Sequence, residues 1–226
     1  MIRIENLSKN YGSKRVLDSI SIEFKPGYVY GIVGENGAGK TTLFRCISGL
    51  ESYEGDVNSD FNKLKDTIGL LLTEPFFFSK MTGKEYIRLL ANARQIELGN
   101  IEEKNVFELP LNQYASTYST GMKKKLALTA ILLQKNEVFI LDEPFNGVDI
   151  QSNLIITEVI AKLKSLKKTI IISSHIFSTL ADTCDEIILM KEGKIVRTVL
   201  RNDFSGLETE MKEFSIGKRI ENLDLK

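Results

Sequence analysis

Residues 28–41 of the chain read YVYGIVGENGAGKT, and this stretch decides the fold. Its second part, Gly34-Glu-Asn-Gly-Ala-Gly-Lys-Thr41, matches the pattern GxxxxGK followed by Ser or Thr, and it lies between a short apolar run and a stretch of helical periodicity. In this pattern the glycines let backbone amides face phosphate groups, and the helix start adds partial positive charge. Lys40 then reaches the β- and γ-phosphates, and the Thr41 hydroxyl binds Mg²⁺. The stretch therefore predicts a nucleotide site.

A glycine-rich turn that merely caps a helix is the alternative interpretation of these residues. The order of strand, loop and helix counts against it, and the glycines do not follow GxGxxG, which disfavours a dinucleotide-binding fold. The residues predicted to contact the nucleotide phosphates are Gly34, Asn36, Gly37, Ala38, Gly39, Lys40, Thr41 and Thr42.

Three short apolar runs, 28–33, 138–141 and 169–172, have the composition of strands buried on both faces. Stretches with helical periodicity follow the first two runs, and this β-α-β alternation predicts a mainly parallel sheet in an α/β fold of the P-loop NTPase type. The apolar faces of these helices are predicted to be Leu43, Cys46, Ile47 and Leu50, then Ile155, Val159, Leu163 and Leu166.

The flanking regions predict the domain organisation. Alternating apolar residues near the start, such as Ile2, Ile4 and Ile20, are typical of half-buried antiparallel strands, and residues 187–199 resemble a closing hairpin. Helical signals dominate from Glu74 to about Leu133. We expect residues 1–73 and 134–200 to form the nucleotide-binding core with an antiparallel β subdomain, residues 74–133 an inserted helical lobe, and residues 201–226 a short surface tail.

The run Val138-Phe-Ile-Leu-Asp142-Glu143 supplies carboxylates at the end of a predicted strand. Asp142 is suited to holding Mg²⁺, usually through water, while Glu143 can orient and deprotonate a water molecule in line with the γ-phosphate. This pair predicts hydrolysis rather than phosphoryl transfer to a substrate. The alternative is that both acids only complement the dipole of a following helix.

The composition restricts the partners. Lys plus Arg and Asp plus Glu both number 30, so no net positive charge favours nucleic acid as a partner. Cys46 and Cys184 have no CxxC spacing and fit unpaired thiols in a reducing cytosol. No signal peptide is predicted, and no apolar run approaches the roughly 18 residues that span a bilayer. Any membrane role is therefore expected to need another chain.

These motifs, in this order, resemble the ATP-binding cassette (ABC) family over almost the entire chain, from Ile2 to about Val199. The distinguishing element is residues 118–126, YSTGMKKKL, which resemble a variant of the family's signature LSGGQ. Ser119 and Gly121 fit the signature, whereas Tyr118, Thr120 and Met122 depart from it.

The residue types at the signature indicate a site independently of the resemblance. Ser119 is a good helix N-cap, yet Gly121 in the first turn costs about 1 kcal/mol of helix propensity. Lysines 123–125 crowd the positive end of the helix dipole. This placement makes sense if an anion binds there, and a solvated basic helix start is the alternative.

The resemblance implies a head-to-tail dimer, in which the signature of one subunit closes over ATP on the phosphate loop of the other. Ser119 and Gly121 are then implied to contact the nucleotide, in a homodimer or with a paired cassette subunit. Asn146-Gly-Val-Asp149 resembles the loop through which the subunits communicate, and Asp149 is implied to be its working residue.

Two further roles come from the resemblance. His175, the only histidine, lies 33 residues after Asp142 and resembles the switch histidine that contacts the γ-phosphate. A solvated or core histidine is the alternative. Tyr11 resembles the aromatic that stacks on adenine, with simple packing as its alternative. The implied catalytic residues are Glu143, His175 and Lys40, the metal ligands are Thr41 and Asp142, and the cofactors are ATP and Mg²⁺.

Two departures from the family pattern concern the lobe. Thr73 occupies the position of a glutamine that contacts metal and water, and its short side chain leads us to expect that Glu74 reaches instead and that hydrolysis is slow or partner-dependent. The 44 residues between Thr73 and Tyr118 make a short segment for this family. Phe76-Phe-Phe78 is expected either to meet a membrane partner or to fill the lobe core.

The resemblance implies the ATP-binding and ATP-hydrolysing subunit of an ABC transporter, with a signature similar to that of exporters. It is expected to act on the cytoplasmic face of the membrane, docked on a separate transmembrane permease, with no nucleic acid as partner. The alternatives are a soluble ABC ATPase without a transport function, and a slow ATP-dependent regulatory switch.

Overall fold

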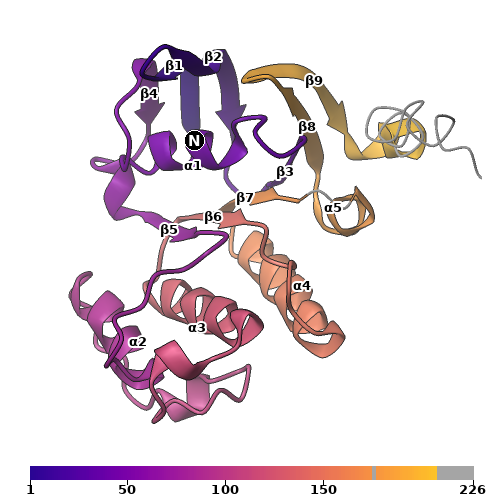
Figure 1. Cartoon of the computed structure of the whole chain (residues 1–226). Coiled ribbons are helices and arrows are strands. Elements are labelled where there is room, and N and C mark those ends of the chain that lie inside the picture. Colours follow the sequence, from indigo (N-terminus) through magenta and orange to yellow (C-terminus); the bar gives the residue numbers. More distant parts are fainter. Residues whose placement is uncertain (175–176, 208–226) are drawn as a thin grey trace, which may run out of the picture.

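A six-stranded, mainly parallel sheet forms the centre of the computed structural model, which describes residues 1–174 and 177–207 (Figure 1). The strand order is β5-β6-β7-β3-β8-β9, and only β8 and β9 pair antiparallel. The parallel sheet and the closing hairpin predicted from the sequence are thus confirmed. The strands are β3 (Val29–Val33), β5 (Ile68–Leu71), β6 (Val138–Asp142), β7 (Thr169–Ser173), β8 (Glu186–Lys191) and β9 (Lys194–Leu200).

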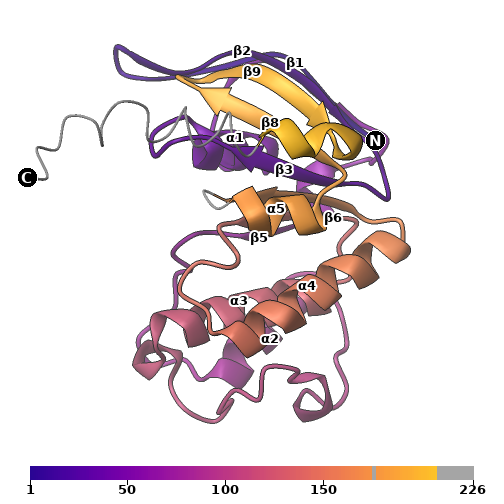
Figure 2. The ribbon, with the colours of Figure 1, turned by 90° about the vertical axis from the view of Figure 1, so that its right-hand side faces the viewer.

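A smaller antiparallel sheet, in the order β2-β1-β4, covers one face of the molecule. It is formed by β1 (Ile2–Tyr11), β2 (Lys14–Phe24) and β4 (Glu54–Ser59), and irregularities in register interrupt the pairing of β1 with both neighbours. Helix α1 (Lys40–Ile47) lies between the two sheets (Figure 2). The expected antiparallel β subdomain is therefore present.

The two faces of the central sheet belong to different apolar clusters, because successive strand residues point to opposite sides. Tyr30 and Ile32 of β3 pack with α1 and the antiparallel sheet. Val29 of the same strand and Leu141 of β6 pack with the helices on the other side.

The helices on the second face are α2 (Gly83–Asn92), α3 (Thr120–Leu133), α4 (Ile150–Ser165) and α5 (Phe177–Thr183). A capping box fixes the start of α2, since Thr82 and Glu85 each accept a hydrogen bond from the backbone N–H of the other. Short 3-10 helices span Leu64–Asp66, Glu102–Lys104, Ala115–Thr117 and Arg201–Asp203. Because no strand of the central sheet lies between β5 and β6, we propose residues 74–133 as the helical lobe.

Three details differ from the sequence-based expectation. Helix α1 ends at Ile47, and Leu50 is exposed. In α4 the fully buried apolar positions are Ile156 and Ile160, while Ile155 and Leu163 of the predicted face are partly buried and pack against the core. The segment after residue 200 does not begin as a surface tail, since Phe204 packs into the core against Phe177.

Candidate active site

The phosphate loop, residues 34–41, joins β3 to α1 and depends on glycine at two positions. Gly39 has φ 104°, in the left-handed region, and a Cβ there would lie 2.9 Å from the Val16 carbonyl oxygen. A Cβ on Gly34 would lie 2.5 Å from the carbonyl oxygen of Met190. The loop is therefore pressed against β2 and β8, and this packing holds the start of α1 at the carboxyl edge of the sheet.

Lys40 is buried in the mouth of the phosphate loop. Its Nζ donates hydrogen bonds to the carbonyl oxygens of Gly34 (2.7 Å) and Glu35 (3.2 Å). Burial lowers the pKa of this ammonium, while the carboxylates of Glu143 and Asp142 act in the opposite direction. The side chain is thus a desolvated cation, and such a cation forms strong charge-assisted hydrogen bonds to phosphate.

The Asp142 carboxylate is 1% exposed and lies at the centre of three hydroxyl groups. Its Oδ2 accepts hydrogen bonds from Thr41 Oγ1 (2.6 Å) and Thr73 Oγ1 (2.8 Å), and its Oδ1 accepts one from Ser173 Oγ (2.5 Å). Carboxylate and hydroxyl oxygens are the ligands of hard divalent cations, so this donor set fits Mg²⁺. Thr73 is expected to be too short for the contact of the family's glutamine with metal and water, yet its hydroxyl reaches Asp142 directly.

Glu143 follows in an unusual backbone conformation. Its φ is 53°, in the left-handed region that non-glycine residues seldom adopt, and its side chain is buried. The backbone N–H donates to Ser173 Oγ (3.0 Å), and the carbonyl oxygen accepts from Lys124 Nζ (2.7 Å). A second acid is therefore held beside Asp142 by contacts to its own main chain.

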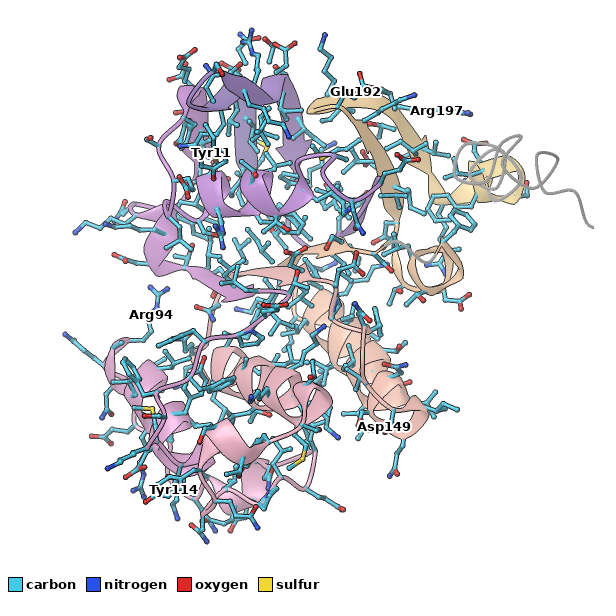
Figure 3. All side chains as sticks on the ribbon, in the orientation of Figure 1. Tyr11, Arg94, Tyr114, Asp149, Glu192 and Arg197 are labelled. Atoms are coloured by element: carbon cyan, nitrogen blue, oxygen red, sulfur yellow. The ribbon has the colours of Figure 1, made fainter. Side chains whose placement is uncertain are left out.

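These groups line one cavity of about 1070 Å³. The predicted site residues that line it are Tyr11, Asn36, Gly37, Gly39, Lys40, Thr41, Thr42, Asp142 and Glu143, while Gly34 and Ala38 do not. The Lys9 ammonium lies 4.9 Å from the Tyr11 ring centroid, and that ring is partly exposed at the end of β1 (Figure 3). The cavity thus connects the phosphate loop with an aromatic ring on the antiparallel sheet.

Sequence reasoning missed several residues of this cavity. They are Lys14, Arg15, Val16, Glu35, Thr73, Asn146 and Glu192. Lys14, Arg15 and Val16 begin strand β2, and Glu192 lies in the β8–β9 turn, so their approach to the phosphate loop depends on how the two sheets pack. The residues Glu35, Thr73 and Asn146 lay in stretches that the sequence did single out, and no local pattern marks the others.

The signature residues lie outside this cavity. Ser119 caps α3 by accepting a hydrogen bond from the Met122 amide (3.2 Å). Gly121 lies against the loop after β6, where a Cβ would be 2.6 Å from the Gly147 carbonyl oxygen. Within one chain the two anion-binding helix starts predicted from the sequence are therefore not brought to the same cavity.

Asp149 is also separate from the phosphate loop. It caps α4 by accepting hydrogen bonds from the Ser152 amide (2.8 Å) and hydroxyl, and its carboxylate pairs with Lys125 (3.1 Å). The bonds from Ser152, followed by that from Lys125, hold the pKa of Asp149 well below its usual range. Figure 3 shows it at the outer end of α4, remote from Tyr11.

His175, the predicted switch histidine, lies outside the described residues. Among the helices of the described ranges 1–174 and 177–207, none combines the length and apolar character needed to cross a membrane.

Comparisons with known proteins agree on one family. Residues 17–146 match the family described as ABC transporter. An uncharacterized ABC transporter ATP-binding protein of Methanocaldococcus jannaschii is 32% identical over 86% of this chain and 76% of its own length. The lantibiotic transport ATP-binding protein SrtF of Streptococcus pyogenes is 31% identical over 92% and 93%.

The fold agrees with solved structures as well. A dimeric ATP-binding cassette in a post-hydrolysis state, bound to ADP and Pi, superimposes with a TM-score of 0.80 at 21% identity, covering 89% of this chain and 99% of its own. At this identity the likeness concerns the fold alone.

Proposed function

This chain belongs to the ABC transporter family, whose match covers residues 17–146, and from that premise we propose that it is the ATP-hydrolysing subunit of a transporter. The observation that carries the proposal is the cavity in which Lys40, Thr41, Asp142 and Glu143 converge. A phosphate loop alone would support binding only. The second acid beside Asp142 adds a base for hydrolysis.

The proposed chemistry is an in-line attack of water on the γ-phosphorus. Lys40 contacts the β- and γ-phosphates, and Glu143 orients the water molecule and accepts its proton. The bond from the γ-phosphorus to the bridging oxygen breaks, and ADP leaves with the electron pair. Mg²⁺, held through Asp142 and Thr41, supplies charge neutralisation of the phosphates when bound.

We expect the hydroxyl of Thr73 to support that metal site. The Thr73→Val variant keeps the side-chain shape and removes the hydrogen bond to Asp142. The affinity for Mn²⁺, used as a paramagnetic probe with ATP and followed by EPR, should fall about tenfold. Thr67→Val, which loses a hydroxyl bonded to the Leu64 carbonyl, is the control. An unchanged Mn²⁺ affinity would show that Thr73 has no part in the site.

A second cassette is proposed to complete the site. Ser119, Gly121 and Asp149 do not line the cavity of their own chain, so a partner arranged head to tail would present them to the γ-phosphate. The family resemblance and the dimeric relative support this arrangement. His175 is assigned to the same phosphate on the resemblance only.

The proposed transmembrane partner would dock near the phenylalanines after β5, on the cytoplasmic face. Phe76 and Phe78 are 72% and 55% exposed, with ring centroids 5.3 Å apart, whereas Phe77 packs against Tyr86. Each of the two alternatives for this stretch therefore applies to different residues. Phe77 packs in the core of the proposed lobe, and Phe76 and Phe78 form an apolar surface. Such a surface on the segment between core and lobe supports docking.

Co-purification tests the proposal. Tagged protein from native membranes in mild detergent should bring down a stoichiometric polytopic protein, and the double variant Phe76→Ser/Phe78→Ser should lose it while keeping ATP turnover of the isolated cassette within twofold. Val106→Ser, at another exposed apolar position of the proposed lobe, is the matched control. Recovery with ribosomes or with nothing would favour a soluble ATPase. ATP-dependent dimerisation without turnover would favour a regulatory switch.

A further inference from the structure

The middle lysine of the run 123–125 differs from its neighbours. Lys124 is 2% exposed, and its Nζ donates to the carbonyl oxygens of Glu143 (2.7 Å) and Asn146 (2.8 Å). Lys125 instead contacts side chains, those of Asp149 and Ser152. A buried ammonium is costly without partners, so these two carbonyl groups fix its position.

The peptide that Lys124 contacts is the one that needs support. The positive φ of Glu143 is unfavourable for a residue with a Cβ, and surrounding contacts must maintain it. The main chain is held on both sides, by Ser173 at the N–H and by Lys124 at the carbonyl oxygen. Because the direction of a side chain follows from its backbone, these contacts set where the carboxylate points.

The contact also joins two elements. Lys124 lies on the second turn of α3, after Ser119 and Gly121, while Glu143 and Asn146 belong to the loop after β6. Gly121 approaches the Gly147 carbonyl oxygen so closely that a Cβ would not fit between α3 and this loop. A shift of α3 would therefore displace the main chain of Glu143.

We propose that Lys124 is a positioning residue that fixes the backbone of Glu143 and so couples the signature helix to the base of the same chain. The inference rests on the proposed function, since it assigns the proton-accepting role to Glu143. Lys124 is not among the residues that line the phosphate cavity. Its effect is exerted through the peptide that it holds.

The variant Lys124→Met tests this by removing the donor while keeping an unbranched side chain. We expect kcat to fall about 100-fold, because a misdirected base loses much of its contribution, with KM and the affinity for ATP within twofold. Lys124→Gln keeps an N–H donor on a shorter side chain, so its kcat should fall less. This variant replaces Lys124→Met in the test if the methionine variant does not fold. Lys162→Met, at an exposed position of α4, should match the parent protein.

A double-variant cycle with Glu143→Gln separates the possible results. If Lys124 acts through the glutamate, the double variant Lys124→Met/Glu143→Gln should have a residual turnover within about twofold of that of Glu143→Gln alone. This slow turnover is followed over hours with γ-labelled ATP. A further large loss, or a kcat of folded Lys124→Met and Lys124→Gln equal to that of the parent, would overturn the inference. Full turnover in Glu143→Gln alone would instead contradict the proposed function.

Discussion

Glu143→Gln is expected to lower ATP turnover by about 10³-fold and to leave ATP binding intact. The amide has nearly the shape of the carboxylate but cannot accept the proton of the attacking water, and general-base catalysis contributes about 10²–10⁴-fold. The backbone contacts to Ser173 and Lys124 do not involve the side chain, so the loop should keep its conformation. Steady-state phosphate release measures the first effect, and equilibrium ATP binding the second.

The same variant should accumulate as a dimer when Mg²⁺ and ATP are present, because bound ATP persists between the two subunits. Light scattering after size-exclusion chromatography should give twice the monomer mass with ATP and the monomer mass with ADP. Glu137→Gln changes an exposed acid just before the same strand, paired with Lys168, and should behave as the parent protein. A strictly monomeric Glu143→Gln protein at saturating ATP would refute the head-to-tail arrangement.

Lys40→Met is expected to weaken ATP binding at least 100-fold. The variant loses a desolvated cation next to the phosphates, and charge-assisted contacts in such a setting are about twice as strong as neutral ones. Titration with a fluorescent ATP analogue, with competition by ATP, measures the change. Lys63→Met, on the exposed segment before β5, is the control.

Stability measurements separate lost binding from lost folding in this variant. Burial lowers the pKa of Lys40, which means that the charged form is disfavoured where it lies, so methionine should leave the free energy of unfolding without nucleotide within about 1 kcal/mol. ATP at 100 times its Kd stabilises the parent by about 2.7 kcal/mol. That increment, seen as a rise in Tm, should fall to about 0.4 kcal/mol or less in Lys40→Met at the same ATP concentration. A preserved ATP-dependent rise would show that Lys40 does not bind the phosphates.

The sequence allowed prediction of the parts of the site that lie on single local motifs. The phosphate loop and the Asp142–Glu143 pair each combine a strand end with special residues, and both line the cavity. The hydroxyl groups of Thr73 and Ser173 could not be assigned, because they come from 69 and 31 residues away along the chain and meet Asp142 only through strand order. The sequence showed Lys124 only as one of three lysines at a helix start. Its burial could not be predicted, because it depends on tertiary packing.

Helix α1 has a consequence for how this protein can diverge. Its residues Leu43, Phe44, Cys46 and Ile47 are all buried in a cluster shared by the antiparallel sheet and the central one. A graft of residues 1–27 from a distant relative would place foreign side chains on α1 and would call for matching changes there. The antiparallel sheet, which carries Tyr11, and helix α1, which follows the phosphate loop, are thus expected to co-evolve.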